Sequence, residues 1–209
     1  MKLDHWYWYF TNALSTKFCE ELLHYGQQQE DKMALTGNLT DPNNLTQKQV
    51  KNLKKKRDSN IVWINAWWVY KHILPFVDEA NKQAGWNFNW SYSETCQFTK
   101  YEPGQFYEWH QDSFEKIYNT PNNPNTHNKI RKLSVACLLS DPNTYKGGEL
   151  EFYQGDPERN NKKSTIKCTQ MSQQGSIVVF PSFMWHRVCP VTEGTRYSLV
   201  VWNLGEKFK

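Results

Sequence analysis

The spacing of apolar residues predicts a strand and then a helix at the start of the chain. Aromatic residues at 6–10 alternate with their neighbours enough to form a short strand. An apolar stripe at helical spacing follows, made of Phe18, Leu22 and Leu23. Ser15 precedes this stripe, and Gly26 is placed to end the helix as a C-cap glycine. We therefore expect an amphipathic helix behind a first strand.

Two further helices are predicted before the pattern changes. Thr46 with Gln49 three residues later resembles a capping box that opens a short basic helix ending near Lys56. A longer amphipathic helix is expected between residue 67 and Gly85, and Pro75 should kink it or start a new turn. Its apolar and aromatic stripe is more typical of a core than of a cofactor site.

From residue 86 the pattern changes to short strands separated by turns, which is typical of a β-sandwich or barrel. Including one strand before the long helix, the strands are predicted near 61–64, 86–91, 94–101, 106–110, 131–139, 149–153, 164–170, 176–180, 185–189 and 196–203. Polar insertions at 113–130 and 154–164 interrupt them. Both are too polar for a core, so we expect surface loops that cover or frame a site.

Composition and charge narrow the classes of protein that fit. The 209 residues can bury a sizeable core, and 25 basic against 21 acidic side chains give a net charge of only +4. This charge does not favour nucleic acid as a partner. The run Lys54–Arg57 is interpreted as a solvated helix end, because no aromatic residues interleave its charges. The composition predicts no oligomeric state.

Cysteine usage and terminal sequence predict a cytoplasmic protein. Five widely spaced cysteines form no CxxC pair, so neither a zinc-thiolate site nor a disulfide framework is indicated. The first ten residues are aromatic but lack the apolar run and cleavage site of a signal peptide. No apolar stretch approaches membrane-spanning length, so no membrane partner is expected.

The candidate chemistry begins in the stretch from Tyr101 to Asp112. A Pro-Gly turn leads into a strand on which His110 and Asp112 stand two positions apart, and alternate side chains of a strand share one face. Later in the chain, a glycine turn, a buried strand and a return strand bring His186 inward. Two imidazoles and one carboxylate leave three positions open on an octahedral ion, which is typical of non-haem Fe(II) oxygenases.

A second pair of polar residues follows the distal histidine. Arg196 and Ser198 share one face of the last predicted strand, ten and twelve residues beyond His186. A guanidinium and a hydroxyl side by side suit a carboxylate, because arginine binds it through two parallel hydrogen bonds.

These segments resemble the 2-oxoglutarate- and Fe(II)-dependent dioxygenases, in their prolyl-4-hydroxylase-like, PKHD-type branch. The resemblance rests on residues 101–112, 131–140, 147–152, 175–186 and 196–202, and it spans roughly 86–203. It implies a mainly β fold with flanking helices: a double-stranded β-helix, or jelly roll, with N-terminal helices packed on one sheet. The expected organisation is one domain over 1–209, with a helical N-terminal support at 1–85 and the jelly-roll core at 86–203.

The resemblance also assigns roles to individual residues. It implies that His110, Asp112 and His186 are catalytic residues that bind Fe(II), and that Arg196 binds the distal carboxylate of the cosubstrate 2-oxoglutarate, helped by Tyr101 and Ser198. Tyr107 and Trp202 stand where the family places pocket aromatics. Ascorbate is a further candidate cofactor. The implied reaction hydroxylates a C–H bond and forms succinate and CO2.

The substrate and two rival functions stay open at this point. A prolyl residue of a peptide or protein is the first candidate substrate, with a small molecule as the second. Arg131 is a weaker candidate for a substrate contact, and Gly147 and Gly148 are expected to form a turn with positive backbone angles. The first rival is a non-catalytic jelly-roll module that binds a carboxylate through Arg196. The second is a zinc hydrolase, since two histidines and a carboxylate also bind zinc.

Overall fold

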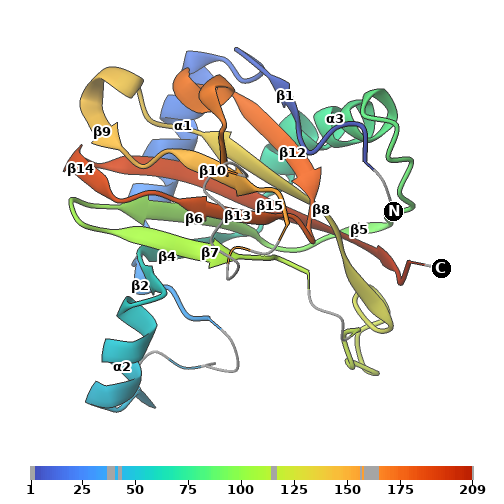
Figure 1. The fold of residues 1–209 in the computed structure, drawn as a ribbon, viewed down its shortest axis with the longest axis horizontal. Coiled ribbons are helices and arrows are strands. Elements are labelled where there is room, and N and C mark those ends of the chain that lie inside the picture. The colour runs from blue at the N-terminus through green and yellow to red at the C-terminus, as the bar shows by residue number, and fades with distance from the viewer. Residues whose placement is uncertain are drawn as a thin grey trace.

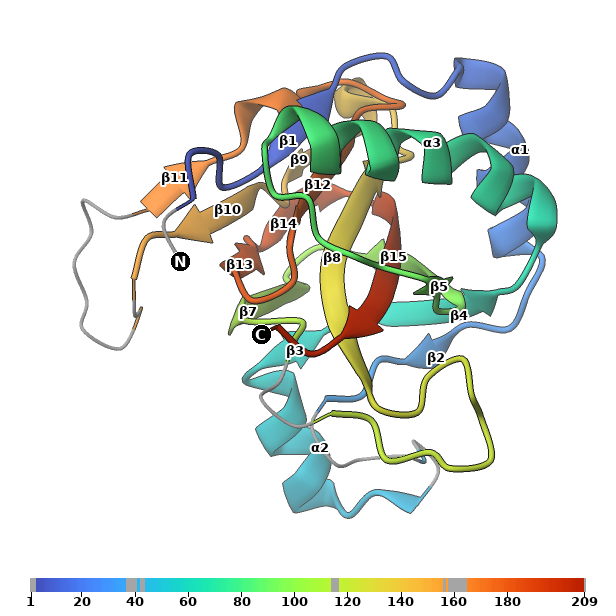
Figure 2. The ribbon, with the colours of Figure 1, turned by 90° about the vertical axis from the view of Figure 1, so that its right-hand side faces the viewer.

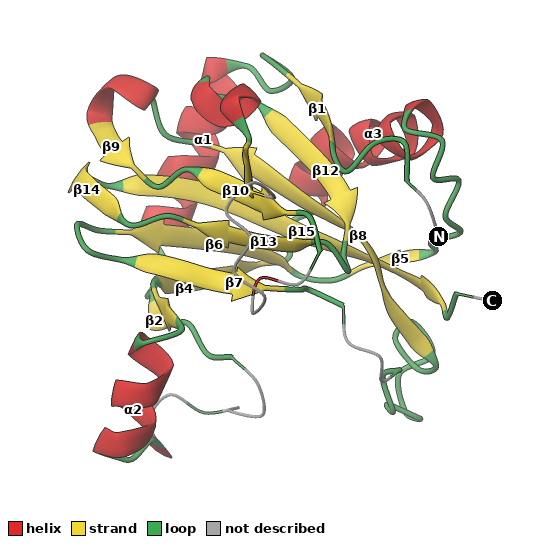
Figure 3. Cartoon of the chain, in the orientation of Figure 1, coloured by secondary structure: helices red, strands yellow, loops and turns green. Residues whose placement is uncertain are grey.

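Most strands of the chain belong to two antiparallel sheets that face each other (Figures 1 and 3). The computed structural model describes residues 3–36, 41, 44–113, 117–155, 157 and 165–208. Its strands are β1 (Trp8–Phe10), β2 (Lys32–Met33), β3 (Arg57–Asp58), β4 (Asn60–Ile64), β5 (Tyr92–Ser93), β6 (Cys96–Tyr101), β7 (Phe106–His110), β8 (Lys129–Leu138), β9 (Tyr145–Gly147), β10 (Leu150–Tyr153), β11 (Thr165–Lys167), β12 (Ile177–Pro181), β13 (Trp185–Val188), β14 (Val191–Gly194) and β15 (Arg196–Glu206).

The larger sheet has eight strands and the smaller sheet has five. The larger runs β1-β12-β8-β15-β6-β4-β2, with β5 paired to β15, and the smaller runs β11-β10-β13-β7-β3. A separate two-stranded ribbon joins β14 to β9. The long central pair β8 and β15 aligns Ser198 with Leu138 and continues to the ends of both strands. This arrangement of two sheets matches the predicted strand-rich architecture.

Helices cover one face of the larger sheet. The chain forms α1 (Thr16–Gln27), α2 (Gln47–Lys54) and α3 (Trp67–Gln83), with short 3-10 helices at Pro142–Thr144 and Thr169–Ser172. Figure 2 shows α1 and α3 against the sheet, whereas α2 lies away from this face and contacts β3 of the smaller sheet. None of the helices in these ranges is both long enough and apolar enough to cross a membrane.

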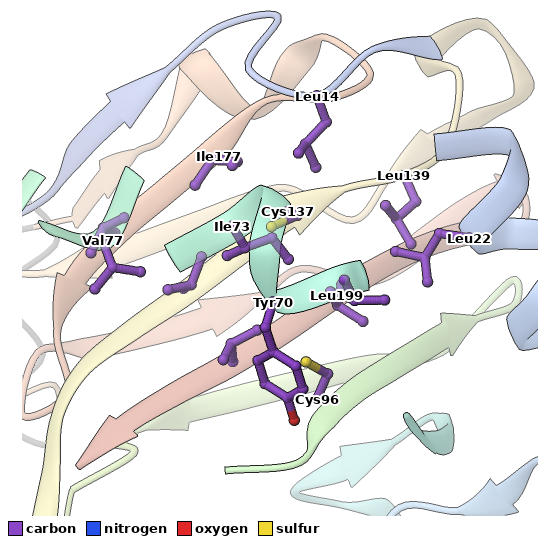
Figure 4. Close-up of a cluster of buried hydrophobic side chains, with 14 of the residues drawn as sticks. Leu14, Leu22, Tyr70, Ile73, Val77, Cys96, Cys137, Leu139, Ile177 and Leu199 are labelled. Atoms are coloured by element: carbon purple, nitrogen blue, oxygen red, sulfur yellow. The ribbon is translucent and has the colours of Figure 1, made fainter. Parts of the chain in front are cut away.

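Two hydrophobic clusters hold these layers together. The first lies between the helices and the larger sheet, where Ile73 and Val77 of α3 meet Cys137 of β8 and Leu199 of β15 (Figure 4). The second lies between the two sheets and joins Phe180 of β12 to Leu150 and Phe152 of β10 and to Met184, just before β13. Because burial of apolar area is the main stabilising contribution to folding, these clusters set the distance between the sheets that frame the pocket.

The N-terminal part contributes strands as well as helices. β1 pairs with β12 and β4 pairs with β6 in the larger sheet, while β3 pairs with β7 in the smaller sheet. The two-residue strands β2 and β3 were not predicted, because they are too short to show alternation. Their pairings show that residues 1–85 take part in both sheets and do not only support them from outside.

Two local predictions are wrong, and a third is contradicted in part. Gly26 does not end α1 but lies inside it, where a Cβ atom would come within 2.8 Å of the Phe98 ring, so the glycine serves close packing. Residues 86–91 are not a strand: Asn87 has a φ of 51°, and the backbone N–H of Phe88 donates to the Asn81 side chain. At Pro75 no new turn starts, because α3 continues through it as one helix, and the alternative of a kink stays a prediction.

Other local predictions are confirmed. Ser15 caps α1 by accepting the N–H of Phe18, and Thr46 forms the predicted capping box with Gln49 at the start of α2. β11 ends at Lys167, earlier than the predicted strand 164–170, because a 3-10 helix follows. Most of 154–164 and residues 114–116 of the other insertion lie outside the described residues, so the expectation that these loops frame the site stays a prediction.

Candidate functional site

Three potential metal ligands meet in the smaller sheet, at the end of β7. His110 is the last residue of β7, and the pairing of β7 with β13 places His186 directly opposite it. Asp112 follows two residues after His110. One ligand atom from each side chain can be chosen so that all lie within 4.8 Å of one another. A single metal ion could therefore be bound by all three.

The turn between β12 and β13 fixes the carboxylate relative to the distal histidine. The backbone N–H groups of Asp112 and Ser113 both donate to the carbonyl oxygen of Ser182, each at 2.9 Å. Ser182 lies in this turn, four residues before His186. The loop that follows β7 is thus tied to the connection between β12 and β13 that leads to His186, and these backbone bonds position both ligands.

Backbone carbonyls orient both imidazoles. Nδ1 of His110 lies 2.7 Å from the carbonyl oxygen of Glu108, and Nδ1 of His186 lies 2.9 Å from that of Met184. A carbonyl only accepts, so each Nδ1 carries the proton and donates it. Each Nε2 atom then carries an unprotonated lone pair. Nε2 of His110 lies 3.7 Å, and Nε2 of His186 lies 3.5 Å, from an oxygen of the Asp112 carboxylate. This is the arrangement that metal-binding histidines use.

The protonation states of the cluster also suit a cation. Burial is the largest influence on Asp112 and raises its pKa, but His186, His110 and Arg131 together outweigh burial, so this pKa is lowered. Burial and then His186 hold the pKa of His110 well below its ordinary value. At neutral pH the carboxylate is ionised and this imidazole is neutral, as metal binding requires.

A buried arginine faces the same pocket without a carboxylate partner. Arg196 is the first residue of β15, only 2% exposed, and its Nη1 donates to the Ser198 hydroxyl at 3.1 Å. No acidic side chain in the described ranges lies within 4.0 Å of its guanidinium. The charge of Arg196 acts on Glu149 only at longer range, and that carboxylate pairs with Lys167 at 2.9 Å. A buried cation without a close partner is costly, so this position favours an anionic ligand.

The predicted neighbours of Arg196 lie beside it. Tyr101 is directly opposite on β6, with its ring centroid 5.6 Å from the guanidinium carbon. These residues and the three potential metal ligands line one pocket, together with Tyr107 and Trp202. The ring of Tyr107 stacks on His110 with centroids 3.5 Å apart. The structure therefore brings together every site residue predicted from the sequence.

The turn glycines also leave space for the side chain of Arg196. Gly147 and Gly148 have φ angles of 76° and 66°, which confirms the predicted positive backbone angles. A Cβ atom on Gly148 would lie 2.6 Å from Cδ of Arg196. Only glycine leaves room for the arginine side chain to pass this turn, and the sequence alone gave no sign of this contact.

Two further arginines lie near the site, and one of them differs from its sequence-based interpretation. Arg131 forms an ion pair with Glu94 at 2.6 Å and lies 3.9 Å above the Trp202 ring, and its expected substrate contact stays a prediction. Arg57, interpreted as part of a solvated helix end, is buried, lines the pocket and lies 4.5 Å above the Tyr107 ring. The preceding lysines are exposed as expected. A strand of two residues gives no sequence signal that would have separated Arg57 from them.

Comparison with known proteins defines the class to which this fold and site belong. Residues 96–203 match the family model described as the 2OG-Fe(II) oxygenase superfamily. The match covers more than half of the chain and contains all six predicted site residues. The chain therefore belongs to the 2OG-Fe(II) oxygenase superfamily, whose name states the cofactor Fe(II) and the cosubstrate 2-oxoglutarate.

Curated relatives resemble the chain over a similar segment. A PKHD-type hydroxylase of Alteromonas mediterranea is 32% identical over 106 residues, which is 50% of this chain and 41% of that protein. One from Synechococcus sp. strain CC9605 is 34% identical over 99 residues, covering 47% and 36%. The matched segment thus spans about two-fifths of the length of these relatives.

Solved structures resemble nearly the whole chain and confirm the jelly-roll fold. A Pseudomonas putida prolyl-4-hydroxylase has a TM-score of 0.67 at 19% identity, covering 98% of this chain and 95% of its own. The viral collagen prolyl hydroxylase of Paramecium Bursaria Chlorella virus-1, in a 2OG complex, has a TM-score of 0.63 at 18% identity, covering 97% of both chains. The predicted fold class, mainly β with flanking helices, is confirmed.

Proposed function

We propose that the chain is an Fe(II)- and 2-oxoglutarate-dependent dioxygenase that hydroxylates a C–H bond of a prolyl residue in a peptide or protein. His110, Asp112 and His186 bind the metal, and Arg196 binds the distal carboxylate of 2-oxoglutarate, with Tyr101 and Ser198 beside it. The observation that carries this proposal is one pocket that holds both the three-ligand cluster and a buried arginine without a carboxylate. The donor set suits Fe(II), because two imidazoles and one carboxylate leave coordination positions open.

Each residue has a defined task in this reaction. Bound Fe(II) and 2-oxoglutarate supply the oxidising chemistry, in which O2 gives one oxygen atom to succinate, with release of CO2, and one to the substrate C–H bond. The Glu108 and Met184 carbonyls hold the imidazoles in the ligating tautomer. Arg196 and Ser198 orient the cosubstrate through its far end. Phe180 and Val188 give the pocket an apolar wall that excludes water.

The choice of a peptide substrate rests on the similarity of this chain to solved prolyl hydroxylases. Among the structural neighbours is a Trichoplax adhaerens prolyl hydroxylase in complex with a peptide fragment, with a TM-score of 0.65 at 18% identity, covering 96% of this chain and 84% of its own. The PKHD-type relatives and the prolyl hydroxylases named above support hydroxylation as the reaction.

The first experiment tests the metal and the cosubstrate together. Fe(II) and 2-oxoglutarate are added to the chain without oxygen, and a visible metal-to-ligand charge-transfer band is expected. With oxygen and a library of proline-containing peptides, succinate should form and a peptide should gain the mass of one oxygen atom. His110→Ala and Asp112→Ala should each abolish succinate formation, and full turnover in either variant would refute the assignment.

The same experiment separates the rival functions. A module that only binds carboxylates would bind 2-oxoglutarate without a charge-transfer band and would form no succinate. A zinc hydrolase would need no 2-oxoglutarate, and Arg196 would have no task in its site. The first rival therefore leaves the three-ligand cluster without a task, and the second leaves Arg196 without one.

A further inference from the structure

A second buried arginine lines the pocket, and the proposed reaction gives it no task. Arg57 is the first residue of β3, stands opposite Tyr107 of β7 and is 5% exposed. Its Nε donates to the Ser59 hydroxyl at 2.9 Å, and its guanidinium lies 4.5 Å above the Tyr107 ring. Its buried Nη2 has no hydrogen-bond partner among the described residues. An unpaired charged donor in a pocket is costly unless a ligand pairs with it.

The charges of the pocket leave one cation in excess. Among the described lining residues, two arginines, Arg57 and Arg196, face a single carboxylate, that of Asp112. A divalent metal ion and a doubly charged 2-oxoglutarate cancel each other when both are bound. One carboxylate of the cosubstrate is taken by Arg196 and the other by the metal, so Arg57 still lacks an anion. A ligand that brings one more negative charge would make the occupied pocket neutral.

Positive charge continues from Arg57 out to the surface. The segment before it carries five exposed lysines on α2 and just beyond, at Lys48, Lys51, Lys54, Lys55 and Lys56. Of these, Lys54 pairs with Asp58 at 3.3 Å. Figures 1 and 2 show that α2 projects from the body of the molecule beside β3, and its lysines are exposed. Lys54 stands three positions before Arg57, a reach of at most about 11 Å along the chain.

We propose that the substrate is an acidic peptide, and that a carboxylate close to the oxidised residue pairs with Arg57 while the lysines of α2 attract the flanking acidic residues. This proposal rests on the proposed function, because it names the substrate class for the same pocket. The planar guanidinium binds a carboxylate through two parallel hydrogen bonds. The lysines raise the rate of encounter more than the final affinity.

An acidic peptide fits the surface of α2 better than a nucleic acid does. Single-stranded nucleic acids are bound by basic grooves with interleaved aromatic residues on which bases stack. The segment from Gln47 to Arg57 contains no aromatic residue. Its lysines can therefore neutralise charge but offer no stacking platform, which favours carboxylates of a flexible chain.

The test compares two peptides that differ only in charge. A fluorescent ten-residue peptide of alternating Glu and Pro, and its Gln-Pro counterpart, are titrated with the full chain by anisotropy, with Fe(II) and 2-oxoglutarate present and oxygen absent. The acidic peptide should bind at least about tenfold more tightly. Arg57→Gln should remove this preference, and Arg57→Lys should restore only part of it, because lysine keeps the charge but not the two-pronged geometry. Equal binding of both peptides by the unchanged chain would overturn the proposal.

Three further measurements test the role of the lysines, binding of the cosubstrate and competition by nucleic acid. Lys51→Gln with Lys55→Gln should weaken binding of the acidic peptide less than Arg57→Gln does, and should reduce its sensitivity to salt. The charge-transfer band titrated with 2-oxoglutarate should be unchanged in Arg57→Gln; a matching loss there would assign Arg57 to the cosubstrate and overturn the proposal. Displacement of the acidic peptide by a ten-nucleotide single strand at lower concentration than by unlabelled peptide would also overturn it. A missing band in the unchanged chain refutes the proposed function itself, while the peptide comparison, repeated without iron, still reports on Arg57.

Discussion

Replacing Arg196 with methionine should separate binding of the cosubstrate from stability of the fold. Methionine has a similar length and no charge, so the substitution removes a cation that is 2% exposed and leaves little empty space. Replacing a buried unpaired ion with an apolar side chain of similar volume is neutral or stabilising by about 1–4 kcal/mol. The lost hydrogen bond to Ser198 offsets about 1.5–3 kcal/mol of that gain. We therefore expect the ligand-free chain to change in stability by no more than about 2 kcal/mol.

The effect of Arg196→Met on the affinity for 2-oxoglutarate should be much larger than its effect on stability. Removing one partner of a buried, hydrogen-bonded charge pair costs about 2–5 kcal/mol, which is about a 30-fold to 5,000-fold loss in affinity. The charge-transfer band titrated with 2-oxoglutarate measures this loss, and urea unfolding without ligand measures the stability. Saturating 2-oxoglutarate should raise the unfolding free energy of the unchanged chain but not that of Arg196→Met.

Arg187→Met is the matched control. Arg187 lies on β13 outside the pocket, where it pairs with Glu151 at 2.8 Å and its side chain is 32% exposed. Loss of this surface pair should cost at most about 1 kcal/mol and leave the affinity for 2-oxoglutarate unchanged. Our reasoning fails if Arg196→Met keeps the affinity for 2-oxoglutarate and instead unfolds at much lower urea, because Arg196 would then be a structural residue.

Two further predictions follow from residues near the pocket. Gly148→Ala should weaken 2-oxoglutarate binding at least about tenfold in the same titration, because the new Cβ would lie 2.6 Å from Cδ of Arg196 and the backbone has a positive φ; unchanged affinity would show that the arginine can move aside. Burial, and then the charge of Glu151, raise the pKa of Cys189 to about 11, so its thiol is protonated at pH 8. The rate of Cys189 labelling by iodoacetamide should rise about tenfold per pH unit between pH 8 and 10. A rate that levels off below pH 9 would contradict this. Cys189→Ser should remove the fastest labelling, because the other cysteines are buried.

The parts of the fold that could be predicted are those set by local patterns. The capping box at Thr46 and the N-cap at Ser15 are short-range hydrogen bonds between residues three apart, so the sequence contains all of the information. Residues 86–91 gave a false strand because aromatic residues alternate there, and two of them, Trp86 and Phe88, are buried against the core from a loop. Alternation shows which side chains are buried and does not show which backbone groups pair.

The metal ligands could be predicted for the same reason. His110 and Asp112 are two residues apart, and a short turn after the buried strand β12 leads directly to His186 on β13. Arg196 begins the next strand of the larger sheet, so its position depends on a short connection. The close contact of Gly148 with Arg196 crosses from one sheet region to another, and no local pattern of residues encodes it.

Arg57 lies outside the part of the site that the chain shares with its superfamily. It reaches the pocket only because β3 pairs with β7, which joins Arg57 to Tyr107, fifty residues later in the chain. The segment that matches the superfamily begins at residue 96, so membership of the family assigns no role to Arg57. The residues that we propose for binding the metal and the cosubstrate all lie within the matched segment, as expected for chemistry common to a superfamily. The charge that meets the substrate comes from an N-terminal strand outside it, and we therefore expect substitutions in 47–57 to change the choice of peptide and leave formation of the iron and 2-oxoglutarate complex intact.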